Sequence, residues 1–281
     1  MVDNRVPTVA VIGTCRVHDT LNEAQSLGLI KLDNGGMNSF VHSLPEILLR
    51  LEVLSRQSEY LKNIVDIQVG TRSGIKLRPE ENFDLENIDV IVIEISSLKA
   101  IFYQEHPLQF NEVNRHLCTP NGEFGNKLRD EINLAFKNRS DNIKTPNIPY
   151  PESIPAKYRE IISGLSPMLM NEESIHSYLG KVIDFVDGKP LLFVNHINIE
   201  GHNGEIIPSR DKLCQIVSNF CENNNIPLFE PAELFQKYEK KDLLAKDGKD
   251  LAHYAKSALE TVGLSQYNRI IDIYHNINSS D

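Results

Sequence analysis

The chain has 281 residues, of which 41% are hydrophobic and 24% are charged, values typical of a folded globular protein. Its formal net charge of −10 argues against a general grip on nucleic acid, because phosphate backbones are bound by clustered Lys and Arg. No apolar run approaches the length of a membrane span, so no membrane-spanning segment is predicted.

The start of the chain and its cysteines predict where the protein resides. The opening residues MVDNRVPTV lack the apolar stretch of a signal peptide. The four cysteines are scattered and form no CxxC pair: Cys15, Cys118, Cys214 and Cys221. We therefore expect reduced thiols in a cytoplasmic protein.

Predicted strands alternate with predicted helices along the chain. The strands are short buried runs at residues 8–12, 64–69, 89–95, 190–195 and 226–229. The helices are one that Ser43 caps and others at 127–137, 174–186, 209–222, 232–240 and 253–273. Residues 16–39 are expected to form mainly a loop, with one short helix.

This alternation predicts a doubly wound α/β fold with a mostly parallel sheet. Five strands favour a flavodoxin-like order, and residues 1–281 are expected to form a single domain. Residues 98–170 are rich in proline and interrupt the alternation, so they are predicted to be a helical and loop insertion that folds over the sheet. Insertions of this kind often serve as lids.

A candidate nucleophile follows the first predicted strand, in the turn Gly13-Thr14-Cys15. Open α/β sheets bind ligands at the carboxyl ends of their strands. Gly13 lets the backbone turn sharply there. Cys15 then lies at the start of the next segment, where backbone N–H groups and a helix dipole favour a thiolate. The alternative interpretation is a buried structural thiol.

A second candidate group lies near the other end of the chain, at Asp250-Leu251-Ala252-His253. An Asp three residues before a His can orient the imidazole and stabilise its charged form, while the imidazole accepts a proton from a nucleophile. Each residue also has an ordinary structural explanation, with Asp250 as a helix cap and His253 as a surface residue.

Taken together, these two motifs resemble those of the SGNH/GDSL hydrolase superfamily, in a variant branch with Cys in place of the nucleophilic Ser. The resemblance implies a flavodoxin-like fold and a Cys15–His253–Asp250 triad. It also implies acyl transfer, or hydrolysis of an ester or thioester, on a small or glycan-linked acyl substrate, as in polysaccharide biosynthesis. No cofactor is required, and because a thiol suits thioester exchange, acyl-CoA is a suitable donor.

The resemblance also implies an oxyanion hole. The family has a Gly after the second strand, where Gly70 or Gly74 could serve. It has an oxyanion-donating Asn after the third strand, but here Ser96 and Ser97 follow that strand. These two hydroxyls, or Asn195 after the next strand, are therefore candidate oxyanion donors.

Two further side chains flank the candidate nucleophile. Arg16 could hold a phosphate or carboxylate of the substrate, or could instead form an ion pair with Asp19 or with an acidic helix. His18 could act as the base in place of His253. The spacing of the other histidines predicts no metal site.

Two non-enzymatic interpretations remain open. In one, the same turn holds a CoA-like or nucleotide-like ligand through its N–H groups, and the protein is a binding module of a biosynthetic pathway. In the other, the chain is a structural partner in a biosynthetic complex and docks through residues 98–170.

Overall fold

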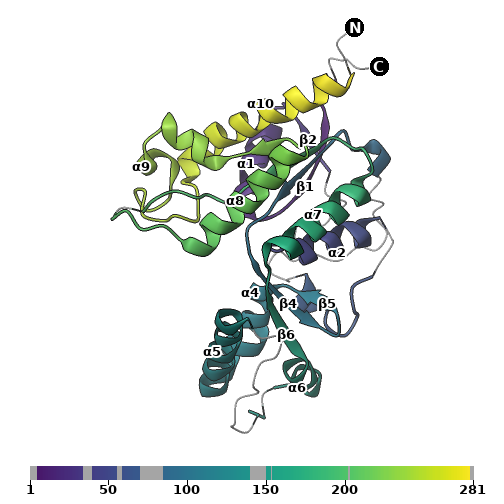
Figure 1. Ribbon diagram of the computed structural model, residues 1–281, viewed down its shortest axis with the longest axis vertical. Helices are drawn as coiled ribbons and strands as arrows, with labels where there is room; N and C mark the ends of the chain where they lie inside the picture. The colour runs from purple at the N-terminus through teal and green to yellow at the C-terminus, as the bar shows by residue number, and fades with distance from the viewer. Residues whose placement is uncertain are drawn as a thin grey trace.

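A computed structural model describes residues 5–33, 40–55, 59–69, 85–139, 150–152, 154–201 and 203–278. Its main body is built on a five-stranded sheet in the order β2-β1-β3-β7-β8, with every neighbouring pair parallel (Figure 1). The strands are β1 (Thr8–Ile12), β2 (Lys31–Leu32), β3 (Val90–Glu94), β7 (Leu191–Val194) and β8 (Leu228–Phe229). This order and direction confirm the predicted flavodoxin-like, doubly wound fold.

Helices cover both faces of this sheet, as Figure 1 shows. One face packs against α2 (Leu44–Leu54), α7 (Glu172–Val186) and α8 (Pro208–Asn223). The other packs against α1 (Cys15–Ser26) and α10 (Leu259–Asn278). Because successive strand residues point to opposite faces, neighbours in β1 and β3 enter different cores. Burial on both faces explains the unbroken apolar runs of these strands.

The predicted strand at 64–69 is wrong. These residues contain a short helix, α3 (Val65–Gln68), which lies in a different hydrophobic core. The second strand of the sheet is β2, inside the segment 16–39 that was expected to be mainly a loop. The error has a simple cause, because periodicity alone does not separate a short apolar strand from a buried helical turn.

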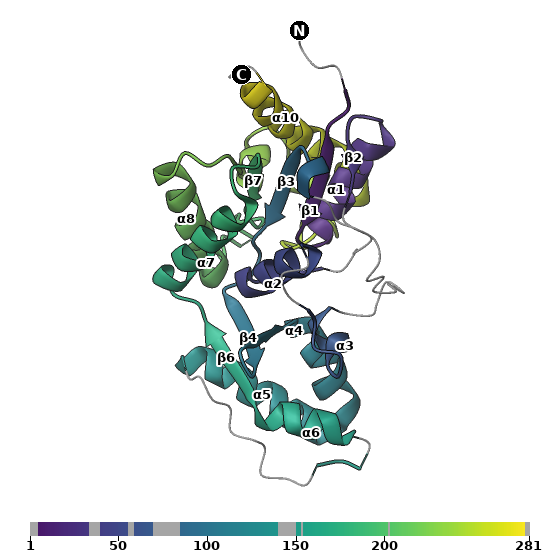
Figure 2. The ribbon, with the colours of Figure 1, turned by 90° about the vertical axis from the view of Figure 1, so that its right-hand side faces the viewer.

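Residues 98–170 form a lobe with a sheet of its own. Three antiparallel strands lie in the order β5-β4-β6, at Lys99–Tyr103 (β4), His106–Leu108 (β5) and Leu165–Leu169 (β6). The helical segments are α4 (Phe110–Val113), a π-helix (Asn114–Cys118), a 3₁₀ turn (Thr119–Asn121), α5 (Gly122–Asn138) and α6 (Ala156–Ser163). Figure 2 shows this lobe beyond the end toward which β3 points. Its function as a lid stays a prediction.

The end of the chain also differs from the expected elements. The last helix begins at Leu259 rather than at His253, after a 3₁₀ turn at Lys256–Ala258. The helix predicted at 232–240 is instead a 3₁₀ helix, Pro231–Gln236, followed by the short α9, Lys240–Leu243. Another 3₁₀ turn, Leu85–Asn87, leads toward β3. Of the helices that the structure describes, none combines the length and apolarity needed to cross a bilayer.

Candidate active site

The turn after β1 brings the candidate nucleophile to the start of α1. Gly13 and Thr14 connect the strand to Cys15, the first residue of the helix, and the Thr14 hydroxyl accepts the Arg16 N–H at 3.4 Å as an N-cap. A Cβ at Gly13 would lie 2.6 Å from the Glu94 Cβ and 2.7 Å from a methyl group of Val17. Glycine is therefore required because the end of β3 packs directly against the turn.

The Glu94 carboxylate holds this turn in place through hydrogen bonds. It is fully buried at the end of β3. Its Oε2 accepts the Thr14 N–H at 2.8 Å and the Thr14 hydroxyl at 2.5 Å, and its Oε1 accepts the Arg16 Nε at 2.6 Å. Three charge-assisted hydrogen bonds thus hold the residues on both sides of Cys15.

The Asp250 and His253 side chains meet each other as the motif predicts. The imidazole Nδ1 lies 3.0 Å from Asp250 Oδ1, which also accepts the Ala252 N–H at 3.1 Å, while Lys246 Nζ lies 3.2 Å from Oδ2. Burial raises the pKa of Asp250, but these three donors outweigh it and hold the pKa at about 2. The carboxylate therefore stays ionised, and it directs Nε2 of the half-exposed His253 away from itself.

A hydrogen bond joins the two motifs. Arg16 Nη1 donates to the carbonyl oxygen of Ala252 at 3.1 Å, across 236 residues of sequence. Cys15 is the residue before Arg16, and His253 is the residue after Ala252. Within the described residues no hydrogen bond links the Cys15 sulfur to His253. Catalytic hydrogen bonds are often long before a substrate binds.

The acidity of Cys15 differs from the expectation of a preformed thiolate. Burial raises the pKa of the thiol, and the carboxylates of Asp19 and Glu94 add to the rise. The Arg16 guanidinium and the N–H of Cys15 itself oppose it without reversing it. Since the thiol is the resting form at neutral pH, a base has to remove its proton during any attack.

This raised pKa predicts slow alkylation. Iodoacetamide should label Cys15 more slowly at pH 7 than it labels a free-thiol peptide, with a rate that climbs as the pH rises toward and above 9. Mass spectrometry of tryptic peptides measures the rate at each site. Cys15 should still react first, because the other cysteines are buried and burial raises the pKa of Cys118 to about 11 and that of Cys214 and Cys221 to about 12. Labelling at pH 7 faster than the peptide would contradict the structure.

The three candidate oxyanion side chains make contacts of their own. The Asn195 amide donates to the carbonyl of Cys214 and to the side chains of Ser218 and Glu230, away from the turn. The Ser97 hydroxyl caps the start of β4 through Lys99, and that of Ser96 donates to the His42 carbonyl at 3.3 Å. The N–H of Cys15 itself contacts the sulfur, and it is the candidate oxyanion donor that the turn supplies. Gly70 and Gly74 lie outside the described residues.

Arg16 and His18 do not have the surroundings that a substrate clamp and a base require. The Arg16 side chain is only 10% exposed, and its charge is paired with Glu94 rather than with Asp19. His18 is buried in α1 and packs against Phe40, and burial lowers the pKa of its imidazole to about 4, which makes it a weak base. Arg16 thus serves as the ion-pair partner of Glu94, and His18 serves as a buried packing residue of α1.

Three residues of the site were not found from the sequence as site residues: Glu94, Arg210 and Tyr254. Arg210 donates to the carbonyl of Leu251, and the buried Tyr254 lies within electrostatic range of Glu94 and Arg16. A usable signal existed only for Glu94, because a single charge that ends a continuous β-branched run has to be paired if the strand is buried.

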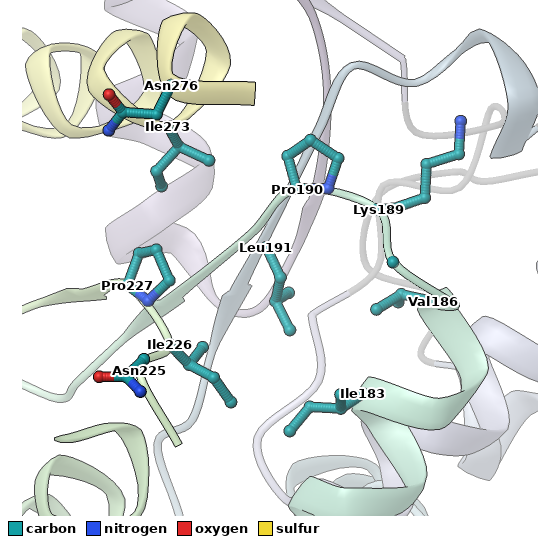
Figure 3. Close-up of a pocket in the computed structure, with 11 residues that line it drawn as sticks. Ile183, Val186, Lys189, Pro190, Leu191, Asn225, Ile226, Pro227, Ile273 and Asn276 are labelled. Carbon is teal, nitrogen blue, oxygen red and sulfur yellow. The ribbon is translucent and has the colours of Figure 1, made fainter. Parts of the chain in front are cut away.

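The described residues hold no group of three or more His, Cys, Asp or Glu side chains arranged to bind a metal ion. A pocket of about 320 Å³ lies at the opposite, amino-terminal edge of the sheet (Figure 3). Apolar side chains such as Leu191 and Ile226 line it, and the Lys189 ammonium there donates to the carbonyls of Glu86 and Ile88. No catalytic group of the two motifs reaches it.

Comparison with known proteins identifies a matching family and a curated relative. The family described as "TviD N-terminal domain" matches residues 7–269. A curated relative, the Vi polysaccharide biosynthesis protein TviD of Salmonella typhi, is 25% identical over 256 residues. The match covers 88% of this chain but only 29% of that protein, so the chain spans less than a third of its relative's length.

Solved structures of esterases and acylhydrolases are similar to the chain over nearly its whole length. A lipase/acylhydrolase from Enterococcus faecalis has 10% identity and a TM-score of 0.43, with 94% of this chain and 95% of that chain covered. A catalytic mutant of an acetylxylan esterase from Geobacillus stearothermophilus has 11% identity and a TM-score of 0.38, with 94% of each chain covered.

Proposed function

The chain belongs to the TviD N-terminal domain family, and from that premise we propose that it is a cysteine-dependent enzyme that transfers or hydrolyses an acyl group. The observation that carries the proposal is the 3.1 Å hydrogen bond from Arg16 to Ala252, which makes neighbours of the segments that carry Cys15 and His253. The naming of the curated relative as a polysaccharide biosynthesis protein supports a glycan as the acyl acceptor.

The first half-reaction forms a thioester on Cys15. The sulfur attacks the acyl carbon of the donor while Nε2 of His253 takes the thiol proton, and Asp250 stabilises the resulting imidazolium. The oxyanion accepts the Cys15 N–H, a type of contact worth roughly 3 kcal/mol. The bond to the leaving group then breaks, and His253 returns the proton to that group. A thioester donor such as acyl-CoA suits this exchange.

The second half-reaction releases the acyl group. Nε2 of His253 takes the proton of an acceptor hydroxyl, whose oxygen attacks the thioester carbon. The carbon–sulfur bond breaks and the proton passes to the departing sulfur, which restores the Cys15 thiol. A sugar hydroxyl gives acyl transfer to a glycan, whereas water gives hydrolysis.

The insertion is the expected contact surface for the acceptor. The loop before α2 donates the Val41 N–H to the Gly13 carbonyl, and its His42 lies 3.3 Å from Asn111 of α4, between the imidazole Nε2 and the amide nitrogen. One loop thus touches both the nucleophile turn and the inserted lobe. This contact supports a substrate-recognition function for residues 98–170.

A binding module for a CoA-like or nucleotide-like ligand is the second candidate function. The raised pKa of Cys15 favours it, because such a module needs no reactive thiolate. Backbone N–H groups at the start of α1 would then hold a phosphate. In this case the protein binds the ligand and leaves it chemically unchanged.

Trapping the acyl-enzyme tests the proposal. The protein is incubated with acetyl-CoA or longer acyl-CoA thioesters and quenched in acid, and its mass is measured intact and as peptides. We expect one acyl mass on the peptide that contains Cys15, none in Cys15→Ala, and an unchanged gain in Cys118→Ala, whose thiol is buried in the inserted lobe. Full acyl-transfer activity in Cys15→Ala would exclude the mechanism, and binding without mass gain or turnover would establish the module instead.

A further inference from the structure

Two arginines reach the turn that carries His253 from distant parts of the chain. Arg16, in α1, donates Nη1 to the Ala252 carbonyl at 3.1 Å. Arg210, in α8, donates its Nη1 to the Leu251 carbonyl at 2.6 Å and to the Ile197 carbonyl at 3.0 Å. Among the described residues these guanidinium groups are the only hydrogen-bond donors to the carbonyls of Leu251 and Ala252.

The two contacts fix the backbone just before His253. A peptide group is planar, so a fixed Ala252 carbonyl also fixes the N–H of His253 and the position of its Cα atom, from which the side chain starts. The turn has little regular structure of its own, and its internal bond from the His253 N–H to the Asp250 carbonyl is long, at 3.5 Å. The orientation of the imidazole therefore depends on the arginines as well as on Asp250.

The placement of Arg210 serves neither an ion pair nor its own helix. No carboxylate among the described residues lies within 4.0 Å of it. Burial and the nearby charge of Arg16 lower the pKa of its guanidinium, and Asp250 opposes this fall without reversing it. A cation in the first turn of α8 also opposes the helix dipole. The hydrogen bonds to the carbonyls of Leu251 and Ile197 therefore explain its position.

We propose that Arg16 and Arg210 are positioning residues that hold consecutive carbonyls of the Asp250–His253 turn and so set the imidazole relative to Cys15. This inference rests on the proposed function and adds two residues to it. Arg16 performs this function while its Nε donates to Glu94, so that one guanidinium connects the nucleophile turn, the end of β3 and the carbonyl that precedes His253.

The test variant is Arg210→Met, which keeps the length of the side chain and removes the donors. We expect kcat for acyl transfer to fall on the order of 10- to 100-fold, with KM for the thioester unchanged, because small errors of placement cost about this much. Arg210→Lys should lie between, since one ammonium can reach one carbonyl. Arg269→Met is the matched control, since Arg269 forms only an exposed pair with Glu233.

The pH profile separates positioning from simple loss of structure. With His253 misplaced, the rate in Arg210→Met should depend on the thiolate already present and keep climbing with pH, whereas the wild type should level off. An Arg210→Met enzyme with unchanged kcat and an unchanged profile would overturn the inference. So would a loss that Arg269→Met reproduces.

A second measurement keeps this test independent of the proposed function. Hydrogen exchange of the Ala252 and His253 amides should quicken in Arg210→Met and not in Arg269→Met, whether or not the protein turns over a thioester. If the wild type is not acylated but exchange is faster in Arg210→Met, the enzymatic function is rejected and the positioning function of the arginines is retained. Unaltered exchange in Arg210→Met would reject the positioning function itself.

Discussion

Glu94→Ala is expected to destabilise the protein by about 3–5 kcal/mol, the usual cost of removing one partner of a buried ion pair. The Arg16 guanidinium would remain in a site where its side chain is only 10% exposed, without the carboxylate that now lies 2.6 Å away. The Thr14 N–H and hydroxyl would lose their acceptor as well. The loss is large because whole domains are stable by only about 5–15 kcal/mol.

Urea unfolding followed by circular dichroism measures this loss. The control is Glu233→Ala, which removes a carboxylate from an exposed pair with Arg269 and should cost no more than about 1 kcal/mol. Replacing both partners, in Glu94→Leu with Arg16→Met, should be less damaging than Glu94→Ala because no buried charge is left alone. A Glu94→Ala protein as stable as Glu233→Ala would show that the ion pair does not organise the turn.

Asp250→Asn should lower the rate of acyl transfer by on the order of 10³- to 10⁴-fold while leaving the fold intact. An asparagine amide in this position can donate to Nδ1 of His253, where the carboxylate now accepts from it at 3.0 Å. Nε2 would then carry the proton and could not take another from Cys15. The acyl-CoA turnover of the two proteins at pH 7.5 gives the ratio.

The pH range in which Asp250 stays ionised follows from its acidity. Its pKa of about 2 lies below the unfolded value of about 3.9. Its ionised form therefore contributes stability at all pH values above about 4, and this contribution is lost as the pH falls toward 2. Loss of activity in mild acid then does not report protonation of Asp250. Lys246→Met, which removes an exposed partner of Asp250, is the control and should keep most of the rate. An Asp250→Asn enzyme with a tenth of the wild-type rate or more would contradict the assigned function of this carboxylate.

The local parts of the site could be predicted because their signals are local. The run of apolar residues at 8–12 has to be a buried strand, and Gly13 after it has to be a turn. The Asp250 and His253 side chains lie three residues apart, so a single tight turn can bring them to 3.0 Å. These features depend on sterics and short-range hydrogen bonds, which neighbouring residues determine almost alone.

The errors came where the outcome depended on distant packing. The run at 64–69 is as apolar as a strand, yet it forms α3 because the core of the inserted lobe, rather than the main sheet, covers it. Burial also decides the acidity of Cys15. A helix N-terminus alone favours the thiolate, but desolvation and the carboxylates of Asp19 and Glu94 outweigh that preference. No sequence pattern near residue 15 predicts how deeply the thiol is buried or which carboxylates lie near it.

The sequence by itself thus determined the α/β class, the turn that presents Cys15 and the Asp250–His253 pair. Only the tertiary structure decided that Glu94 neutralises Arg16, that Arg16 and Arg210 hold the turn before His253, and that Asn195 points elsewhere. The physical reason is range. Apolar runs and tight turns are encoded over a few positions, whereas the partner of a guanidinium is one of all the acceptors that folding brings within hydrogen-bond distance.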